Sequence, residues 1–451
     1  MNKKLLNSRW IRISLFLLAL FVVVPSINIA LANQTAIKYP DAEKYKPTPV
    51  PDRIVLTWKG EPTTTQAVSW RTDTSVLTPQ AQIAVAEDGP NFKQNATTVT
   101  AESSTDVKGN QNYTAKFHTV QFKDLTPNTK YLYRVGDGVN WSEWFQFTTA
   151  STKNEPFAFL YVGDAQNDIL EHWSRVIRKA YSDLPDARFI IHAGDLINHG
   201  DADEQWGEWF EAGGWLNGMV PSIPTPGNHE YAKIVPNTPS SLSPYWRPQF
   251  ALPENGPAGH EETVYYTDYQ GMRIISLDTN KKGAELDKQA AWLEEALKNN
   301  PNKWTVITFH HPIFANSPGR DNVEIREKLL PIVQKYNVDL VLQGHDHSYA
   351  RGHVSNLPTG VTAKDPKSNT VFVVSVSGPK MYDLTHKNWE ENGAEVRKSV
   401  KNTQLYQLIR VDGNVIRYEA RTATGSLFDG FELKKSANGE KEIKDLKMKD
   451  K

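Results

Sequence analysis

The chain has 451 residues, of which 51 are basic and 52 acidic, so it lacks the basic excess typical of a nucleic-acid-binding protein. It contains no cysteine, which excludes disulfides, thiolate metal ligands, cysteine nucleophiles and lipid-modified cysteine anchors. His, Asp and Asn side chains remain as ligands for any metal. The length is sufficient for two domains with separate cores.

Residues 1–32 have the pattern of a secretory signal peptide. Four basic residues flank the start of an apolar run over 13–24, and Ala30-Leu31-Ala32 matches a small-residue cleavage site. We therefore predict cleavage after Ala32 and a secreted protein, located outside the cell or in the cell envelope. The alternative is an uncleaved anchor, although the run is shorter than the ~20 residues that span a bilayer. No later segment is long and apolar enough for a membrane span.

An N-terminal segment (33–50) precedes a predicted antiparallel β-sandwich over 51–150. Runs of β-branched and aromatic residues between turn residues predict strands over 54–58, 65–70, 117–122, 130–135 and 144–148. The segment Leu125-Thr126-Pro127-Asn128-Thr129-Lys130-Tyr131-Leu132-Tyr133 resembles the turn-and-tyrosine signature of fibronectin type III domains. Because no ionisable residues cluster here, we interpret this domain as a support module.

After a polar linker the pattern changes to apolar strands alternating with amphipathic helices, which predicts an α/β domain over 156–433 with sheets at its centre. Strands are predicted over 157–162, 188–193, 272–277, 304–309, 338–342, 370–376, 404–411 and 415–421. A helix is predicted over 286–297. The Lys- and Glu-rich segment 434–451 is expected to be a solvated, disordered tail.

Five short motifs in this domain carry residues suited to metal chemistry, and most follow directly on an apolar strand. The motifs are Gly163-Asp164-Ala165-Gln166, Gly194-Asp195-Leu196-Ile197-Asn198, Gly227-Asn228-His229-Glu230, Phe309-His310-His311-Pro312 and Gly344-His345-Asp346-His347. The carboxyl ends of strands are where α/β folds place ligand sites.

Carboxylates, a carboxamide oxygen and neutral imidazoles suit divalent ions such as Mn, Zn, Fe or Co. The glycine before each of Asp164, Asp195, Asn228 and His345 is expected to let the backbone turn sharply at the strand end. One shared carboxylate can bridge two ions, the arrangement that activates a hydroxide for attack on phosphorus. A single motif of this kind is usually a turn, but five in one domain predict a two-metal site.

The order and composition of the motifs resemble the calcineurin-like metallophosphoesterase superfamily, and within it the purple acid phosphatase branch. Tyr349 and Arg351 extend the last motif in the same pattern, and a fibronectin-like N-terminal domain is characteristic of that branch. The resemblance covers about residues 50–430. It implies two packed sheets flanked by helices and two divalent metal ions.

The resemblance also implies roles for individual residues. Asp195 would bridge the ions, and His229 would act as general acid beside the phosphate. The remaining implied ligands are Asp164 and His347 for the first ion, and Asn228, His310 and His345 for the second. For His311, packing and contact with substrate remain equal alternatives. His192 lies inside a strand and is interpreted as structural, and His172 and His353 match no ligand position.

Two positions depart from the family pattern. Asn198 stands where purple acid phosphatases have a tyrosine, and Gln166 stands where most other members of the superfamily have a histidine. Since a tyrosinate favours a ferric ion and gives the purple colour, we expect a colourless enzyme with two divalent ions. Gln166 is either a weak ligand of the first ion or faces substrate, and Asn198 either supplies an oxygen there or contacts substrate. The acid pH optimum of the branch is not carried over.

These observations predict a secreted, metal-dependent phosphomonoesterase, similar to acid phosphatases, that uses a hydroxide activated by two metals. The substrate would be a small-molecule or polymer phosphate ester, and no nucleic-acid-binding surface is predicted. Two alternatives remain. One is a phosphodiesterase acting on nucleotides, lipid headgroups or cell-wall polymers, and the other is a binding protein with a degenerate metal site. Loops over 235–252 and 355–368 are expected to shape the substrate groove.

Overall fold

A computed structural model describes residues 41–232, 240–354 and 370–447. Residues Asp41–Lys44 form helix α2, and the chain from Tyr45 onward forms a separate compact unit. The predicted signal peptide, residues 33–40, residues 235–239 of one predicted groove loop and the whole of the other lie outside the described residues. None of the described helices combines the length and the apolar character that crossing a membrane requires.

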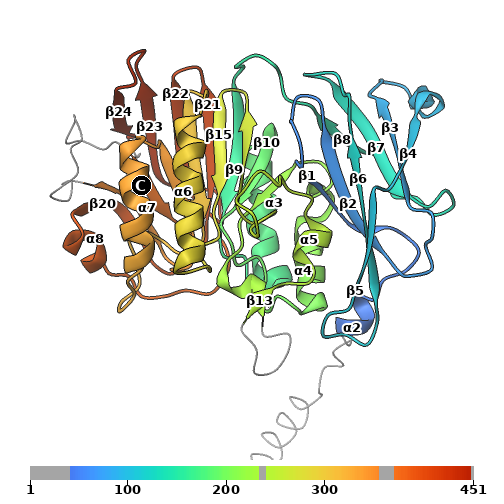
Figure 1. The fold of residues 1–451 in the computed structure, drawn as a ribbon, viewed down its shortest axis with the longest axis horizontal. Helices are drawn as coiled ribbons and strands as arrows, with labels where there is room; N and C mark the ends of the chain where they lie inside the picture. Colours follow the sequence, from blue (N-terminus) through green and yellow to red (C-terminus); the bar gives the residue numbers. More distant parts are fainter. Residues whose placement is uncertain (1–40, 233–239, 355–369, 448–451) are drawn as a thin grey trace, which may run out of the picture. The chain divides into compact units, whose positions relative to one another are not determined.

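The N-terminal domain is the predicted β-sandwich (Figure 1). Its described strands form two four-stranded sheets, in the orders β1-β2-β6-β5 and β4-β3-β7-β8. The strands are β1 (Asp52–Thr57), β2 (Gln66–Thr72), β3 (Gln80–Val85), β4 (Thr97–Thr100), β5 (Ser103–Val107), β6 (Ala115–Phe122), β7 (Lys130–Gly136) and β8 (Phe145–Thr148).

Strand β7 shows the period-two burial that its sequence pattern predicted. In β7, Tyr131, Tyr133 and Val135 are buried and alternate with more exposed residues. The Tyr131 hydroxyl accepts a hydrogen bond of 2.9 Å from the Thr126 N–H, which fixes the predicted turn against the sheet. Strands β3, β4 and β5 were not predicted; β4 is almost fully exposed and therefore shows no apolar alternation.

The C-terminal domain contains two seven-stranded sheets among its described residues, in the orders β11-β10-β9-β21-β22-β23-β24 and β14-β15-β16-β17-β19-β18-β20. Strands of the first sheet are β9 (Phe157–Val162), β10 (Ala187–His192), β11 (Ser222–Pro224), β21 (Leu405–Asp412), β22 (Val415–Thr422), β23 (Leu427–Lys435) and β24 (Lys441–Asp445). Strands of the second sheet are β14 (Tyr265–Tyr269), β15 (Met272–Ser276), β16 (Trp304–Phe309), β17 (Leu340–Gln343), β18 (Tyr349–Val354), β19 (Val371–Val374) and β20 (Ala394–Val400). A small hairpin pairs β12 (Tyr231–Ala232) with β13 (Ser241–Leu242).

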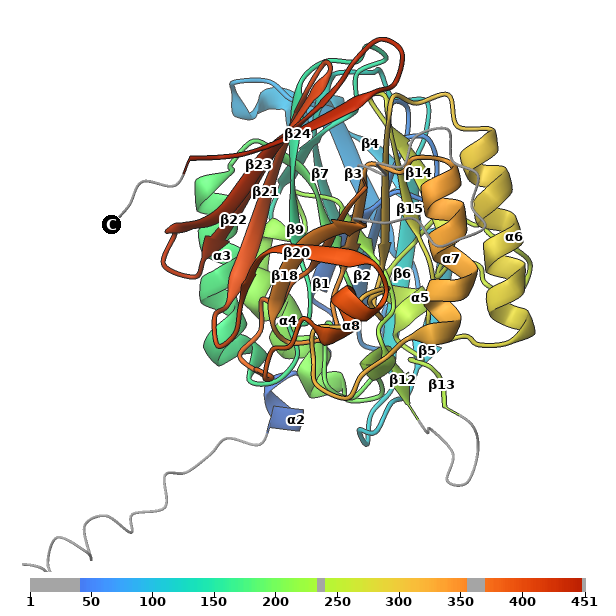
Figure 2. The same ribbon diagram turned by 90° about the vertical axis from the view of Figure 1, so that its left-hand side faces the viewer.

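Figure 2 shows the two sheets between two helical layers, with α3 and α4 on one side and α6 and α7 on the other. The helices are α3 (Ser174–Asp183), α4 (Asp203–Gly213), α5 (Trp246–Gln249), α6 (Ala284–Lys298), α7 (Val323–Lys335) and α8 (Lys387–Glu391). Alternate residues of β16 serve two cores: Val306 joins the core between the sheets, whereas Ile307 and Phe309 pack with the helical layer of α6 and α7. Burial on both faces explains why the central strands are continuously apolar.

The prediction of a disordered tail is wrong for the described residues 434–447. Strand β23 continues to Lys435, and β24 pairs with it antiparallel. Strand β24 has no buried residue, and β23 is not buried after Leu433, so the composition of 434–447 resembles that of a tail. Ion pairs anchor both strands to the domain: the buried carboxylate of Asp339 lies 2.7 Å from the Lys435 ammonium and 2.9 Å from the Lys441 ammonium.

A buried ion-pair cluster joins the two domains at the first residue of α4, Asp203. Its carboxylate accepts hydrogen bonds from Arg53 (2.7 and 2.8 Å), Arg71 (2.9 Å) and the Tyr113 hydroxyl (2.8 Å), all from the sandwich. Removing one partner of a buried pair of this kind typically costs about 3–5 kcal/mol. The start of α4 is therefore fixed by the N-terminal domain.

Candidate metal centre

The five sequence motifs converge because five parallel strands end at one place. Strands β9, β10 and β11 are parallel neighbours, and so are β16 and β17 in the other sheet. The loops that follow them contact one another directly: the Asp164 N–H donates to the Gly194 carbonyl (3.0 Å) and the Gly344 N–H to the His310 carbonyl (3.1 Å). The site therefore lies where the two sheets meet at their carboxyl ends, as predicted.

Several candidate ligands adopt the left-handed backbone conformation. The φ angle is 51° at Asp164, 51° at Asp195, 75° at His345 and 35° at His347. Each such non-glycine residue costs on the order of 1–3 kcal/mol, and strain of this kind collects at functional sites. The surrounding contacts must therefore hold these residues in place.

The predicted role of the glycines is right for one position only. Gly194 has a positive φ of 85°, whereas the turn at the other motifs is made by the ligand residues themselves. Gly227 and Gly344 are needed for space, since a Cβ atom would lie 2.2 Å from Asp195 Oδ1 and 2.3 Å from Asp164 Oδ2, respectively. These glycines let the backbone approach the carboxylates.

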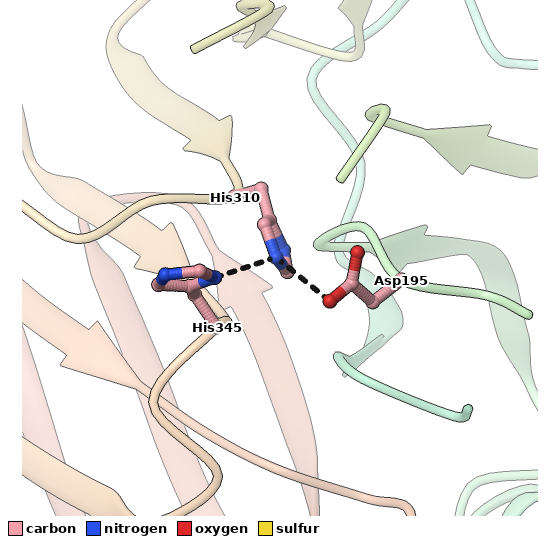
Figure 3. A group of neighbouring side chains, drawn as sticks. All are labelled: Asp195, His310 and His345. Atoms are coloured by element: carbon pink, nitrogen blue, oxygen red, sulfur yellow. Dashed lines mark hydrogen bonds and ion pairs between the residues drawn. The ribbon is translucent and has the colours of Figure 1, made fainter. Parts of the chain in front are cut away.

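One group of possible ligands surrounds the Nε2 atom of His310 (Figure 3). This nitrogen lies 3.0 Å from Asp195 Oδ2, 3.1 Å from Asn228 Oδ1 and 3.1 Å from His345 Nδ1. The His310 Nδ1–H donates to the Ala193 carbonyl (2.9 Å), which leaves the lone pair of Nε2 available to a cation. A single ring nitrogen cannot satisfy three polar partners, so the arrangement fits a cation at the centre of these side chains.

The other group contains Asp164 and His347, the residues assigned to the first ion, and shares Asp195 with the group around His310. It is called the first ligand group below, and the group around His310 the second. His347 Nε2 lies 3.6 Å from Asp164 Oδ1, and its Nδ1–H donates to the Lys380 carbonyl (2.9 Å). The ligand atoms within each group lie within 4.8 Å of one another. The structure thus brings together the six residues that the resemblance implied as metal ligands, and Asp195 is common to both groups.

The ionisation of the buried carboxylates also fits a cation. Burial raises the pKa of Asp164 well above its usual value. Burial acts in the same direction on Asp195, but the positive charge of His310 outweighs it and lowers the Asp195 pKa. Asp195 in turn overcomes the effect of burial on His310 and raises the His310 pKa to about 9. In the protein alone, a proton on His310 balances Asp195, and a divalent ion would supply that charge instead.

Gln166 provides a further test of whether metals fit this site. Its side chain is fully buried, and its Oε1 atom has no hydrogen-bond partner among the described residues. Its Nε2 atom lies 2.9 Å from His347 Nε2 and 3.2 Å from Asp195 Oδ2. A buried amide oxygen without a partner is costly unless something else binds it. The amide therefore contacts Asp195 and His347 of the first ligand group, and its role as a weak ligand or as a substrate contact stays a prediction.

Asn198 and His229 form a pair in which the backbone of one orients the side chain of the other. The His229 Nδ1 atom lies 2.6 Å from the Asn198 carbonyl, and the His229 N–H donates to Asp195 Oδ1 (2.9 Å). The Asn198 side-chain amide contacts the exposed His199 ring instead (3.0 Å). The structure thus places the His229 ring beside the shared carboxylate, whereas the Asn198 amide bonds to His199 and to none of the candidate ligands among the described residues.

His311 lies against the site without joining either ligand group. Its ring centre lies 4.4 Å from that of His345, and its Nδ1 atom bonds to the Thr279 hydroxyl (2.9 Å). Burial, followed by the charge of His310, lowers the His311 pKa well below its usual value, so the ring is neutral. The Thr279 contact fixes the ring and leaves its Nε2 edge for another partner.

Sequence reasoning missed the role of Glu230. Its buried carboxylate accepts three backbone N–H groups, from Gly227 (2.6 Å), Asp195 (2.9 Å) and Leu196 (2.7 Å). It therefore ties the loop after β11 to the loop after β10. The residue stands in the third motif, directly after His229, so its position was visible, but nothing in the sequence indicated which backbone groups it would bind.

Three other histidines lie away from the ligand groups. His192 is buried in β10 between Trp173 and Trp209, which agrees with its structural interpretation. His172 is in the π-helical turn η2 (Ile169–Trp173) before α3, and His353 is in β18. Neither appears in a candidate metal group of the described residues.

Comparison with known proteins gives two family matches along the chain. The family described as Purple acid Phosphatase, N-terminal domain, matches residues 51–149, and the family described as Calcineurin-like phosphoesterase matches residues 157–349. An uncharacterized protein of Mycobacterium tuberculosis is 26% identical over 338 residues, which cover 67% of this chain and 62% of that protein. Acid phosphatase type 7 of Mus musculus is 28% identical over 339 residues, which cover 69% of this chain and 72% of that protein.

Among solved structures, a purple acid phosphatase from yellow lupin (Lupinus luteus) seeds has the same fold. The TM-score is 0.70 at 19% sequence identity, over 86% of this chain and 75% of the lupin chain. This likeness confirms the predicted architecture of a β-sandwich followed by a two-sheet α/β domain.

Proposed function

Because the chain belongs to the calcineurin-like metallophosphoesterases and carries the N-terminal domain of their purple acid phosphatase branch, we propose that it is an exported hydrolase of phosphomonoesters that uses two divalent metal ions. The observation that carries this proposal is the pair of ligand groups with Asp195 in common. Two ions that share one carboxylate are the usual basis of hydrolysis at phosphorus without a covalent intermediate.

In this proposal Asp164, His347 and Gln166 hold the first ion, Asn228, His310 and His345 hold the second, and Asp195 contacts both. The ions, from the group Mn, Zn, Fe and Co, would polarise the phosphate oxygens and lower the pKa of bound water. The backbone contacts to Ala193 and Lys380 keep the His310 and His347 rings in the tautomer that presents Nε2 to the site.

His229 is the residue best placed to protonate the leaving oxygen. Its Nδ1 atom is held by the Asn198 carbonyl, so only Nε2 can exchange a proton with substrate. This atom lies 3.9 Å from Asp195 Oδ2, and 23% of the side chain is exposed, which gives a substrate access to it. Burial lowers the His229 pKa, and the Asp195 charge opposes this effect. A proton on Nε2 is therefore readily released to a leaving alkoxide.

His311 completes the substrate-facing side of the site in this proposal. With Nδ1 bonded to Thr279, its neutral Nε2 is free to contact a phosphate oxygen. Since the same residues would serve a phosphodiester, the reaction class is decided by experiment and not by these contacts.

The test is metal-dependent hydrolysis of an aryl phosphomonoester and of the matching diester by protein beginning at residue 33, after chelation and re-addition of single ions. We expect Mn, Zn, Fe(II) or Co to restore monoester hydrolysis and Ca to fail. Faster diester hydrolysis would change the assignment to a phosphodiesterase. Phosphate binding without turnover, under every ion, would indicate a degenerate site. Export is tested separately, by expressing the full-length chain and determining whether the protein secreted into the medium begins at Asn33.

A further inference from the structure

An aromatic ring with two cations on it borders the first ligand group. The Tyr382 ring centre lies 4.6 Å from that of His347, and the Tyr382 N–H donates to the His347 carbonyl (3.1 Å). The Arg320 guanidinium lies 4.9 Å from the centre of the same ring, and the Lys380 ammonium lies 5.5 Å from it. Cation–aromatic contacts of this length hold both charges near one surface. None of these three residues belongs to a sequence motif.

The two cations differ in their partners. Arg320 donates to the His345 carbonyl (2.8 Å) and to Asp346 Oδ1 (2.9 Å), so it is anchored to the last metal motif. Lys380 contributes its backbone carbonyl to His347, whereas its ammonium group has no hydrogen bond or carboxylate partner among the described residues. The side chain that borders the site therefore carries a positive charge that the described protein does not neutralise.

Lys380 borders the first ligand group through both its backbone and its side chain. Its carbonyl oxygen accepts the His347 Nδ1–H, and its ammonium group lies over the Tyr382 ring, which contacts the His347 ring. Both cations therefore lie beside the group that contains Asp164 and His347.

We propose that Lys380 and Arg320, gathered on the Tyr382 ring, form a subsite that binds a second phosphate of the substrate beside the first ligand group. The preferred substrates are then phosphoric esters or anhydrides with another phosphate close to the scissile one, and not esters with a neutral leaving group. This inference rests on the proposed function, since it uses the same metal centre to bind the scissile phosphate. Arg320 supplies a fixed fork of donors, and Lys380 supplies a mobile charge.

Another cation near the site serves as a matched control. Lys282 follows β15, is exposed, and its charge lowers the pKa of His311, which packs against His345 of the other ligand group. Substitution of Lys282 removes the same charge as substitution of Lys380, but away from Tyr382. If the site only attracts anions in general, both substitutions should weaken anion binding equally. If Lys380 belongs to a subsite, only its substitution should reduce the preference for a second phosphate.

The experiment measures binding and does not require turnover. Isothermal calorimetry on the Mn-loaded full mature chain compares methylphosphonate with methylenediphosphonate, whose P–C–P link cannot hydrolyse. We expect wild-type protein to prefer the diphosphonate, and Lys380→Met to reduce that preference about tenfold. Lys282→Met should keep the preference within about twofold, and Lys380→Arg should restore most of it.

Unchanged preference in Lys380→Met, or equal losses in Lys380→Met and Lys282→Met, would overturn the subsite while leaving the proposed function intact. Failure of the loaded wild-type protein to bind methylphosphonate at all would instead count against the metal centre itself, and the subsite would fall with it. Circular dichroism of each variant checks that the fold is retained.

Discussion

Both domains bury histidines, and the way each domain satisfies them separates a structural from a chemical role. In the sandwich, His118 is fully buried, and its two ring nitrogens bond to the hydroxyls of Thr72 and Ser104, both at 2.8 Å. In the metal centre, His310 faces another imidazole, a carboxylate and an amide. Both ring nitrogens of His118 are satisfied by hydrogen bonds while the ring is neutral. His310 has more partners than a ring nitrogen can serve, so it needs a cation.

The largest test of this contrast removes the charge that the two ligand groups share. We expect Asp195→Asn to lower kcat/KM for an aryl phosphomonoester at least about 1,000-fold, equivalent to about 4 kcal/mol, because both ions lose a common ligand. Metal content, measured by mass spectrometry of the desalted protein, should fall with it. The exposed Asp186→Asn is the control, with activity within about twofold. Wild-type activity in Asp195→Asn would show that the shared carboxylate is dispensable.

The next test concerns the sandwich and its response to acid. Burial, followed by the charge of Lys116, lowers the His118 pKa to about 4, below the ~6.5 of an unfolded histidine. The folded state therefore favours the neutral ring, and its contribution to stability is intact above pH 6.5 and lost as the pH falls toward 4. Over that window the loss is about 3 kcal/mol.

Hydrogen exchange of peptides from β2 and β6, corrected for the intrinsic pH effect, reports this loss locally. Chelated protein should show weaker protection at pH 4.5 than at pH 7, and His118→Gln should flatten that difference because the new side chain does not titrate. An equal pH dependence in wild type and His118→Gln would contradict the interpretation of a neutral, satisfied ring.

The smallest expected effect concerns the amide oxygen of Gln166. If this buried atom contributes to the first ion, Gln166→Ala should weaken the affinity for that ion about tenfold, or about 1.4 kcal/mol. Competition with a fluorescent chelator measures the affinity. Asn198→Ala is the matched control, because the Asn198 amide contacts His199, and it should leave metal affinity within about twofold. Equal effects of both substitutions would assign Gln166 no special role.

The sequence predicted the parts of this molecule that depend on apolar strands. Strands β9 and β16 have the predicted bounds, and the five motifs meet because parallel strands end at a common edge. The helix predicted over 286–297 is α6, only a few residues longer. These features follow from local composition and from the rules for parallel sheets.

The rest depends on contacts between residues distant in sequence. Strand β24 resembles a tail until Lys441 is seen to pair with Asp339. Tyr382 follows no predicted strand or motif, and only the fold brings it against His347. The left-handed conformation of His345 depends on its N–H bonds to both oxygens of Asp164, at 2.9 Å each. No period in the sequence encodes such pairings.

The cluster at Asp203 links the sandwich to the chemistry in a way that constrains how the protein can change. Two residues further along α4, Gln205 accepts the N–H groups of Asn198 (2.9 Å) and His199 (2.8 Å), and Asn198 holds His229. Arg53 and Arg71 thus act, through the start of α4, on the loop after β10 that contacts His229, the proposed general acid. A lineage that lost or exchanged the sandwich would leave a buried carboxylate without its partners. The two domains are therefore expected to be inherited as one unit and not recombined as separate modules.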